Sequence, residues 1–123
     1  MKEFYNYKIR KVVKVYDGDT ITVDIDLGFN TVMTNQKLRL YGINTPEVRG
    51  ESKEEGKMVR DFVRSVLVGN PDVYISSYYD KSGKYGRWLA TVHYLPIGKE
   101  GVGYINLNDE LLEKGYAVEY MKK

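Results

Sequence analysis

The segment that decides the fold class is Tyr7–Gly28, which reads YKIRKVVKVYDGDTITVDIDLG. Polar and apolar residues alternate strictly in its second half: Thr20, Ile21, Thr22, Val23, Asp24, Ile25, Asp26 and Leu27. A period of two is typical of a strand that buries one face. The preceding triplet, Asp17–Asp19, has the composition of a tight turn. The segment therefore predicts two strands joined at DGD.

Three more strands follow from similar patterns. The run QKLRLYGI continues a third strand to about Ile43. The runs DVYISSYY and RWLATVHYL predict two further strands, with the turn DKSGKYG between them.

Two segments change to a helical period. In SKEEGKMVRDFVRSVLVGNP the apolar residues fall on one side of a helix: Met58, Val59, Phe62, Val63, Val66 and Leu67. Ser52 and Glu55 have the spacing of a capping box, and Gly69 begins the stop signal. A second, short helix is expected near NLNDELLEKG, with Asn106 or Asn108 as its cap.

The order of elements is three strands, a helix, two strands and a helix. Strands that follow one another without intervening helices favour an α+β fold, mainly β, with a largely antiparallel sheet. We expect a five-stranded OB-fold barrel with two packed helices, formed by one domain over residues 1–123.

The composition excludes several kinds of site. The chain has no cysteine, which excludes disulfides, cysteine zinc sites and thiol nucleophiles. His93 is the single histidine, so a histidine-rich zinc site is excluded as well. No run is long enough to span a membrane, and the first residues do not form a secretory signal. We expect a cytoplasmic protein unless a leader has been removed.

The net charge of +2 is too small to indicate a polyanionic partner by itself. The first strand is more basic: residues 2–14 contain four lysines and one arginine against a single glutamate. The pattern fits a solvated strand face or a surface that contacts phosphates, and both interpretations stay open.

Each of the following motifs fits a catalytic or binding role and also a purely structural one. Asp17 and Asp19 flank Gly18, so a sharp turn would bring two carboxylates together, either as cation ligands or as solvated turn residues. In the third strand, Leu38 and Leu40 point one way, which sends Arg39 to the opposite face. An arginine there is suited to holding a phosphate, although an exposed strand arginine is an equally plain interpretation.

Two further stretches place charged groups at corners. In NTPE, Pro46 makes the backbone extended and orders the corner, which fixes the direction of the Glu47 carboxylate, as a general base requires. In GKYGRWLA, Lys84 and Arg87 lie beside a tight turn, from which a basic side chain would reach a second phosphate oxygen. A hairpin turn with solvated charges is the alternative for this second stretch.

The chain resembles the staphylococcal nuclease (thermonuclease) family in four motifs that keep the family's order and similar spacing: VYDGDTITV, LRLYGINTPE, GKYGRWLA and NDELLEKGYA. The resemblance covers the chain from about Val12 to Val118. It implies an OB-fold barrel and a Ca²⁺-dependent hydrolase that cleaves DNA and RNA with little sequence preference. The expected cut is at the P–O5′ bond and leaves a 3′-phosphate.

The resemblance also implies a role for each matching residue. Asp19 matches a calcium ligand, and Thr45 matches a residue whose backbone carbonyl binds the same ion. Glu47 matches the proposed general base, and Arg39 and Arg87 match the arginines that hold the phosphate. The remaining matches lie near the nucleotide or support the turn: Lys84, Tyr85 and Asp17.

Asn44 is the main departure from the family, which usually has aspartate there as a second carboxylate ligand. An amide oxygen still coordinates a cation, but the site loses one negative charge. We expect weaker calcium binding, an altered metal preference or, at the extreme, an inactive site. The tyrosine with which the family contacts the nucleotide has no secure match, and Tyr116 and Tyr120 are the candidates. Trp88 is expected in the core or on the barrel surface.

Three functions remain open at this stage. The first is a metal-dependent nuclease that acts on DNA or RNA as a monomer. The second is a non-catalytic nucleic-acid-binding OB-fold module, in which Asn44 marks a degenerate metal site. The third is a protein-interaction module on the same barrel, which predicts an aromatic pocket.

Overall fold

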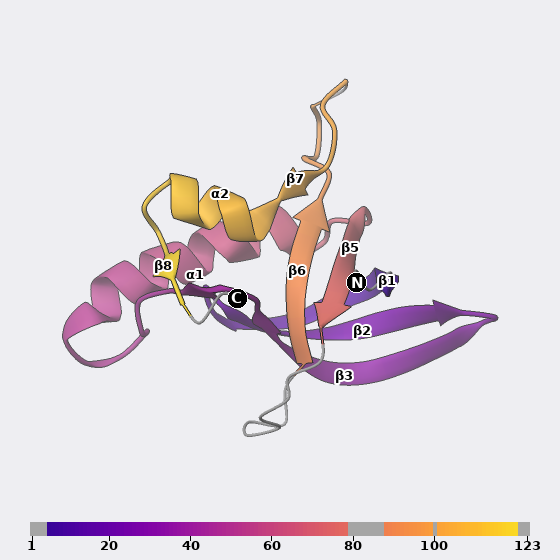
Figure 1. Cartoon of the computed structure of the whole chain (residues 1–123), viewed down its shortest axis with the longest axis horizontal. Helices are drawn as coiled ribbons and strands as arrows, with labels where there is room; N and C mark the ends of the chain where they lie inside the picture. The colour runs from indigo at the N-terminus through magenta and orange to yellow at the C-terminus, as the bar shows by residue number, and fades with distance from the viewer. Residues whose placement is uncertain (1–4, 79–87, 100, 121–123) are drawn as a thin grey trace.

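The computed structural model describes residues 5–78, 88–99 and 101–120 of the chain. Its elements in chain order are β1 (Asn6–Asp17), β2 (Thr20–Gly28), β3 (Thr31–Leu40), β4 (Ile43–Asn44), a 3-10 turn (Gly50–Ser52), α1 (Lys53–Leu67), β5 (Val73–Tyr78), β6 (Trp88–Tyr94), β7 (Ile105–Asn106), α2 (Leu107–Glu113) and β8 (Val118–Glu119). Figure 1 shows the helices on one side of the long β2–β3 pair. Within the described ranges, neither helix is long and apolar enough to cross a membrane.

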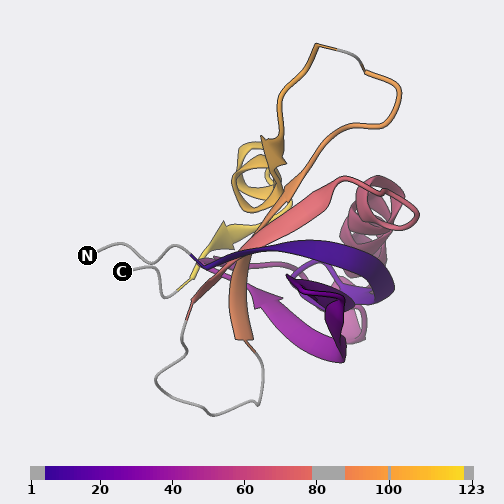
Figure 2. The same ribbon diagram turned by 90° about the vertical axis from the view of Figure 1, so that its right-hand side faces the viewer.

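Five of the strands close into a barrel. The described strands pair in the order β3-β2-β1-β5-β6, and a parallel pairing of β3 with β6 completes the ring. The two-residue strand β7 extends β6, and β4 forms a separate short ladder with β8. Figure 2 shows the strands curving around this barrel. The expected α+β OB-fold with two packed helices is confirmed.

The barrel core comes from the alternating faces of its strands. In β3, Leu38 and Leu40 are both buried, as their spacing predicted. In α1 the buried side chains are Val59, Val63 and Leu67. Met58, which was also expected on the buried side, is 45% exposed, because it lies at the edge of the apolar stripe.

Strand β1 does not follow a simple alternation. Its pairing with β2 shifts register three times, and each shift adds one residue to β1. Its buried side chains therefore recur every three residues, at Ile9, Val12 and Val15, with two exposed residues in each interval. Bulges of this kind bend a strand and increase its twist, which helps the sheet to curl into a barrel.

The third strand is shorter at its end than its sequence pattern predicted. It stops at Leu40, because the chain turns at Gly42, whose φ is +79°. Ile43 and Asn44 then leave the barrel and pair with Glu119 and Val118. This corner carries the NTPE segment away from the barrel wall.

The N-terminus of α2 has a side-chain cap, whereas that of α1 has none. The capping box expected at Ser52 is wrong, since the Ser52 side chain makes no cap and its Oγ donates to the carbonyl of Glu47 instead, at 3.0 Å. In α2, Asn106 is the cap and accepts a hydrogen bond from the amide of Asp109 at 3.0 Å. The start of α1 is therefore tied to the NTPE corner.

Asn108, the other candidate cap, is buried at the junction of α2 and the barrel. Its Oδ1 accepts from the amide of Val92 at 3.0 Å. Its Nδ2 donates to the carbonyls of Tyr41 at 2.9 Å and Ala90 at 3.2 Å. One side chain therefore satisfies three backbone groups where α2, β6 and the end of β3 meet.

We predict that Asn108→Ala lowers the free energy of unfolding by about 3 kcal/mol, because each buried polar group left unsatisfied costs about 1–3 kcal/mol. Urea unfolding followed by circular dichroism measures the change. The matched control is Glu113→Ala, at an exposed position of the same helix. A loss below about 1 kcal/mol for Asn108→Ala would contradict this role.

Candidate functional site

The DGD turn lies where the barrel, α1 and the NTPE corner meet. A Cβ added to Gly18 would lie 2.6 Å from Cγ1 of Val59 and 2.9 Å from Cγ2 of Thr45. Contacts that short leave no room for a side chain, so glycine is required by the close approach. The turn thereby places Asp19 against the corner.

Asp19 is buried and holds three neighbours. One carboxylate oxygen, Oδ2, accepts the amide of Thr45 at 2.9 Å and lies 3.4 Å from Nη1 of Arg39. The other, Oδ1, accepts the hydroxyl of Thr20 at 3.1 Å. A buried carboxylate is tolerated only when it is paired and hydrogen-bonded, and here both conditions are met.

Arg39 lies on the outer face of β3, as the strand parity predicted, and its side chain is 15% exposed. Its Nη2 donates to Oδ1 of Asn44 at 3.2 Å. The ring of Tyr120 lies against the guanidinium, with 5.2 Å between the ring centroid and Cζ. Arg39 therefore bridges Asp19 and Asn44, two of the residues expected to bind a metal.

We call Asp19, Arg39 and Thr45 the Asp19 cluster. Two buried polar atoms of this cluster make no hydrogen bond in the described part of the chain. They are Nη1 of Arg39, whose contact with Asp19 is an ion pair without hydrogen-bond geometry, and Oγ1 of Thr45. Buried polar groups are normally satisfied, so two unsatisfied atoms in one cluster point to a polar partner that binds there.

The oxygen atoms around this cluster fit a hard cation. Asp19 offers a carboxylate, Asn44 an amide oxygen and Thr45 a backbone carbonyl, which are ligand types that Ca²⁺ accepts. The described residues contain no group of three or more acidic or histidine side chains placed to share a metal. A cation at this site would therefore have few charged ligands.

Asp17 supports the turn from its other end. Its Oδ1 accepts the amide of Asp19 at 3.1 Å. Burial raises the pKa of Asp17 to about 7, and hydrogen bonding and charge repulsion from Asp19 add to the effect. Asp17 and Asp19 therefore differ in their roles although they flank the same glycine.

Glu47 is exposed beside the cluster, and its backbone is fixed by α1. A Cβ added to Gly56 would lie 2.0 Å from the Glu47 carbonyl oxygen, so the helix and the corner touch without an intervening side chain. The Ser52 hydroxyl binds the same carbonyl. The structure thus gives Glu47 a fixed backbone and a carboxylate that reaches solvent.

Three of the expected site residues are not covered by the structure. Lys84, Tyr85 and Arg87 lie outside the described residues. Their expected roles at the nucleotide and the phosphate stay predictions.

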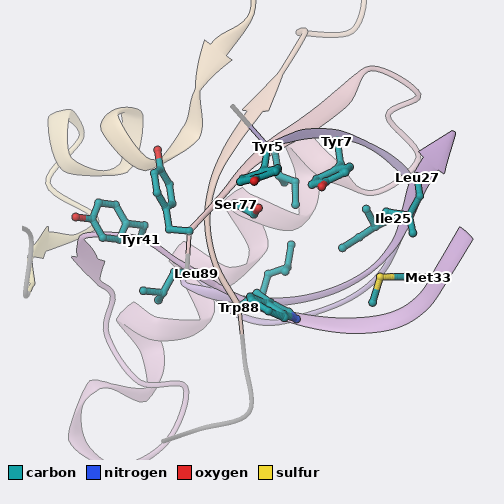
Figure 3. A pocket seen from close by; sticks show the side chains of 12 residues that line it. Tyr5, Tyr7, Ile25, Leu27, Met33, Tyr41, Ser77, Trp88 and Leu89 are labelled. Atoms are coloured by element: carbon teal, nitrogen blue, oxygen red, sulfur yellow. The ribbon is translucent and has the colours of Figure 1, made fainter. Parts of the chain in front are cut away.

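The barrel also carries an aromatic cavity of about 730 Å³. Its lining includes Tyr5, Tyr7, Met33, Tyr41, Tyr78 and Trp88. Figure 3 shows Tyr5 and Tyr7 next to one another on one side of the space and Trp88 on the other. The residues of this cavity could not be predicted from the sequence, because its aromatic residues come from four segments and no local pattern joins them.

Leu38 and Arg39 place the cavity and the site on opposite faces of β3, because successive residues of a strand point to opposite sides. Leu38 lines the cavity, and the next residue, Arg39, belongs to the cluster around Asp19. Trp88 pairs with Leu38 across the barrel closure and is 46% exposed. It is therefore on the barrel surface, one of the two positions expected for it.

The remaining candidate residues differ in whether they contact the Asp19 cluster. Tyr120 lies at Arg39, whereas Tyr116 packs edge-on against Phe62 with ring centroids 5.5 Å apart. His93 stacks on Tyr74 at 4.5 Å, and burial lowers its pKa. Neither Tyr116 nor His93 makes a contact with the Asp19 cluster in the described structure.

Comparison with known proteins identifies relatives over most of the chain. Residues 37–123 match the family model described as staphylococcal nuclease homologue. A thermonuclease from Staphylococcus hyicus is 38% identical over 117 residues, which is 91% of this chain and 59% of that protein. An uncharacterized protein from Methanocaldococcus jannaschii is 31% identical over 131 residues, 90% of this chain and 58% of that protein. The chain thus spans less than two thirds of the length of both relatives.

We predict that ionisation of Asp17 destabilises the fold. Its pKa rises from 3.8 to about 7 on folding, so protonation favours the folded state between these values. This stabilisation is complete below pH 4 and is lost as the pH rises through 7. The melting temperature of the wild type should therefore fall relative to that of Asp17→Asn as the pH rises from 4 to 7.

Thermal unfolding in a chelator, at intervals from pH 4 to pH 8, measures this difference. Glu113→Gln, at an exposed position, is the control that should follow the wild type. A constant difference between wild type and Asp17→Asn across the range would show that the carboxyl is not perturbed.

Proposed function

Because the chain belongs to the staphylococcal nuclease homologue family, we propose that it is a metal-dependent nuclease that hydrolyses DNA and RNA with little sequence preference. The observation that carries the proposal is the buried cluster of Asp19, Arg39 and Thr45 beside the exposed Glu47. It combines an unsatisfied cationic donor, oxygen ligands and a carboxylate at a fixed corner. Phosphodiester hydrolysis needs these three elements.

The proposed cofactor is one Ca²⁺ ion held by Asp19, Asn44 and the carbonyl of Thr45. When bound, it supplies positive charge that neutralises the phosphate oxygens. The support for this assignment is the oxygen-only ligand set and the unsatisfied Oγ1 of Thr45 in the same cluster.

The residues of the chain take the remaining roles. Arg39 is proposed to bind a phosphate oxygen through its guanidinium, and Arg87 to bind a second one. The Glu47 carboxylate takes a proton from the attacking water. The water oxygen forms the new bond to phosphorus, the P–O5′ bond breaks, and solvent protonates the leaving oxygen. The products are a 3′-phosphate and a 5′-hydroxyl.

Lys84 and Tyr85 are proposed to bind the nucleotide next to the scissile phosphate. Asp17 has a supporting role, since it accepts the backbone amide of Asp19 and so holds the turn. Tyr120 holds the guanidinium of Arg39 from its ring face. Cation–π contacts of this kind contribute about 0.5–2 kcal/mol, which adds to the ion pair with Asp19 and the hydrogen bond to Asn44.

A non-catalytic nucleic-acid-binding module is the second candidate, and one observation favours it. Arg39 donates to Asn44 and pairs with Asp19, so a guanidinium already contacts both side chains proposed as metal ligands. The neutral amide at position 44 weakens the competition of a metal ion with this arginine. In this case binding is independent of calcium and cleavage is absent.

We predict that Asn44→Asp raises the affinity for Ca²⁺ about tenfold or more, because a second carboxylate adds a full negative charge to the ligand set. Isothermal titration calorimetry measures the affinity directly and does not depend on cleavage. Equal affinities of the wild type and Asn44→Asp would show that position 44 does not contact the ion.

We predict that the purified protein cleaves heat-denatured DNA with calcium and not with a chelator. Glu47→Gln should lower kcat by about 10²–10⁴, the usual contribution of a general base. Glu51→Gln, an exposed neighbour, is the matched control and should keep the wild-type rate. Separate reactions with magnesium report the metal preference.

No cleavage with either metal, together with retained DNA binding, would favour the binding module over the nuclease. If neither DNA nor RNA binds, both candidates fail. The aromatic cavity would then become the first place to look for a peptide partner.

A further inference from the structure

The outer face of β1–β3 carries lysines that the proposed chemistry does not use. On β1, Lys8, Lys11 and Lys14 are exposed, and the residue that follows each of them is buried. Lys37 on β3 is also exposed. We call Lys8, Lys11, Lys14 and Lys37 the basic face.

The pairing of the strands connects the basic face to the site. Lys14 pairs with Thr22, and Thr22 pairs with Lys37. The two lysines therefore lie on either side of Thr22 in one row across the sheet. The next row contains Thr20 and Arg39. Two residues along a strand correspond to roughly 7 Å, so Lys37 and Arg39 are neighbours on the same face of β3.

The acidic residues of this face bind backbone amides and form no ion pair with the lysines in the described residues. Asp24 and Asp26 are the β2 partners of Lys11 and Lys8. Their carboxylates instead accept backbone amides, Asp24 from Asn35 at 2.9 Å and Asp26 from Gly28 at 2.8 Å. In the described residues no carboxylate lies within ion-pair distance of the basic face.

A second contact extends the positive charge around the edge of the site. Lys14 lies over the ring of Tyr16, with its Nζ 5.9 Å from the centroid. The hydroxyl of Tyr16 accepts a hydrogen bond from Nη2 of Arg49 at 2.7 Å. Arg49 is two residues after Glu47, so Tyr16 connects Lys14 of the basic face to a cationic residue near the proposed general base in sequence.

We propose that the basic face binds the phosphate backbone of a single-stranded nucleic acid that extends beyond the scissile phosphate. The strand runs from Arg39 to the row of Lys14 and Lys37, and then along β1 to Lys11 and Lys8. The contacts are to phosphates only, which fits a substrate read without regard to sequence. This proposal rests on the proposed nucleic-acid substrate but not on its cleavage.

The test measures binding of labelled oligonucleotides in a chelator by fluorescence anisotropy, with lengths of about 3 and 12 nucleotides. Lys14→Gln/Lys37→Gln should weaken binding of the longer strand fivefold or more and that of the shorter strand less than twofold. The slope of log K against log salt for the longer strand should flatten by about 1.4, or 0.7 for each lost phosphate contact. The matched control, Lys99→Gln/Lys114→Gln, removes the same charge from exposed positions elsewhere and should alter neither quantity.

Equal losses in the two double variants would overturn the proposal, since general charge and not this face would then control binding. So would a wild type that binds both lengths equally, or one that binds phosphatidylserine vesicles but not the oligonucleotides. Because the measurement needs no cleavage, an inactive protein with a length-dependent and lysine-dependent affinity would refute the nuclease and still support the basic face. Thermal unfolding of each variant verifies that the fold is intact.

Discussion

The structure of this chain depends on one buried carboxylate, that of Asp19. A charge at this depth is costly unless it is fully paired, and its partners come from three different places in the chain. Thr20 follows it directly, Arg39 lies on the adjacent strand β3, and Thr45 lies on the corner beyond β4. The need to satisfy one acid therefore draws together the turn, the strand and the corner from which the site is made.

The second requirement is close contact between backbone segments, and it explains two glycines. Gly18 lets the turn approach Thr45 and α1, and Gly56 lets α1 touch the carbonyl of Glu47. Without these contacts the corner would be an ordinary exposed loop. With them, the helix serves as a rigid support behind the proposed general base, although no side chain of the helix itself needs to react.

The sequence was sufficient to predict the barrel, because alternation in β2 and in the end of β3 reports directly which side is buried. It was also sufficient to place Arg39 opposite Leu38 and Leu40. It was insufficient for features in which distant segments decide the outcome. The bulges of β1 depend on its partner strand, and the aromatic residues of the cavity come from four segments. At the start of α1 a local alternative decided the outcome, because the Ser52 hydroxyl donates to the carbonyl of Glu47 instead of capping the helix.

The short ladder between β4 and β8 has a consequence for the order of assembly. Asn44 is held by a strand near the other end of the domain, and the amide of Tyr120 closes the ladder on the carbonyl of Gly42. Contacts so distant in sequence require a long loop to close, which costs conformational entropy. A chain still emerging from the ribosome holds the turn and β3 but not this clasp. The proposed site is therefore completed only after synthesis has passed Tyr120, because Asn44 is not held in place before then.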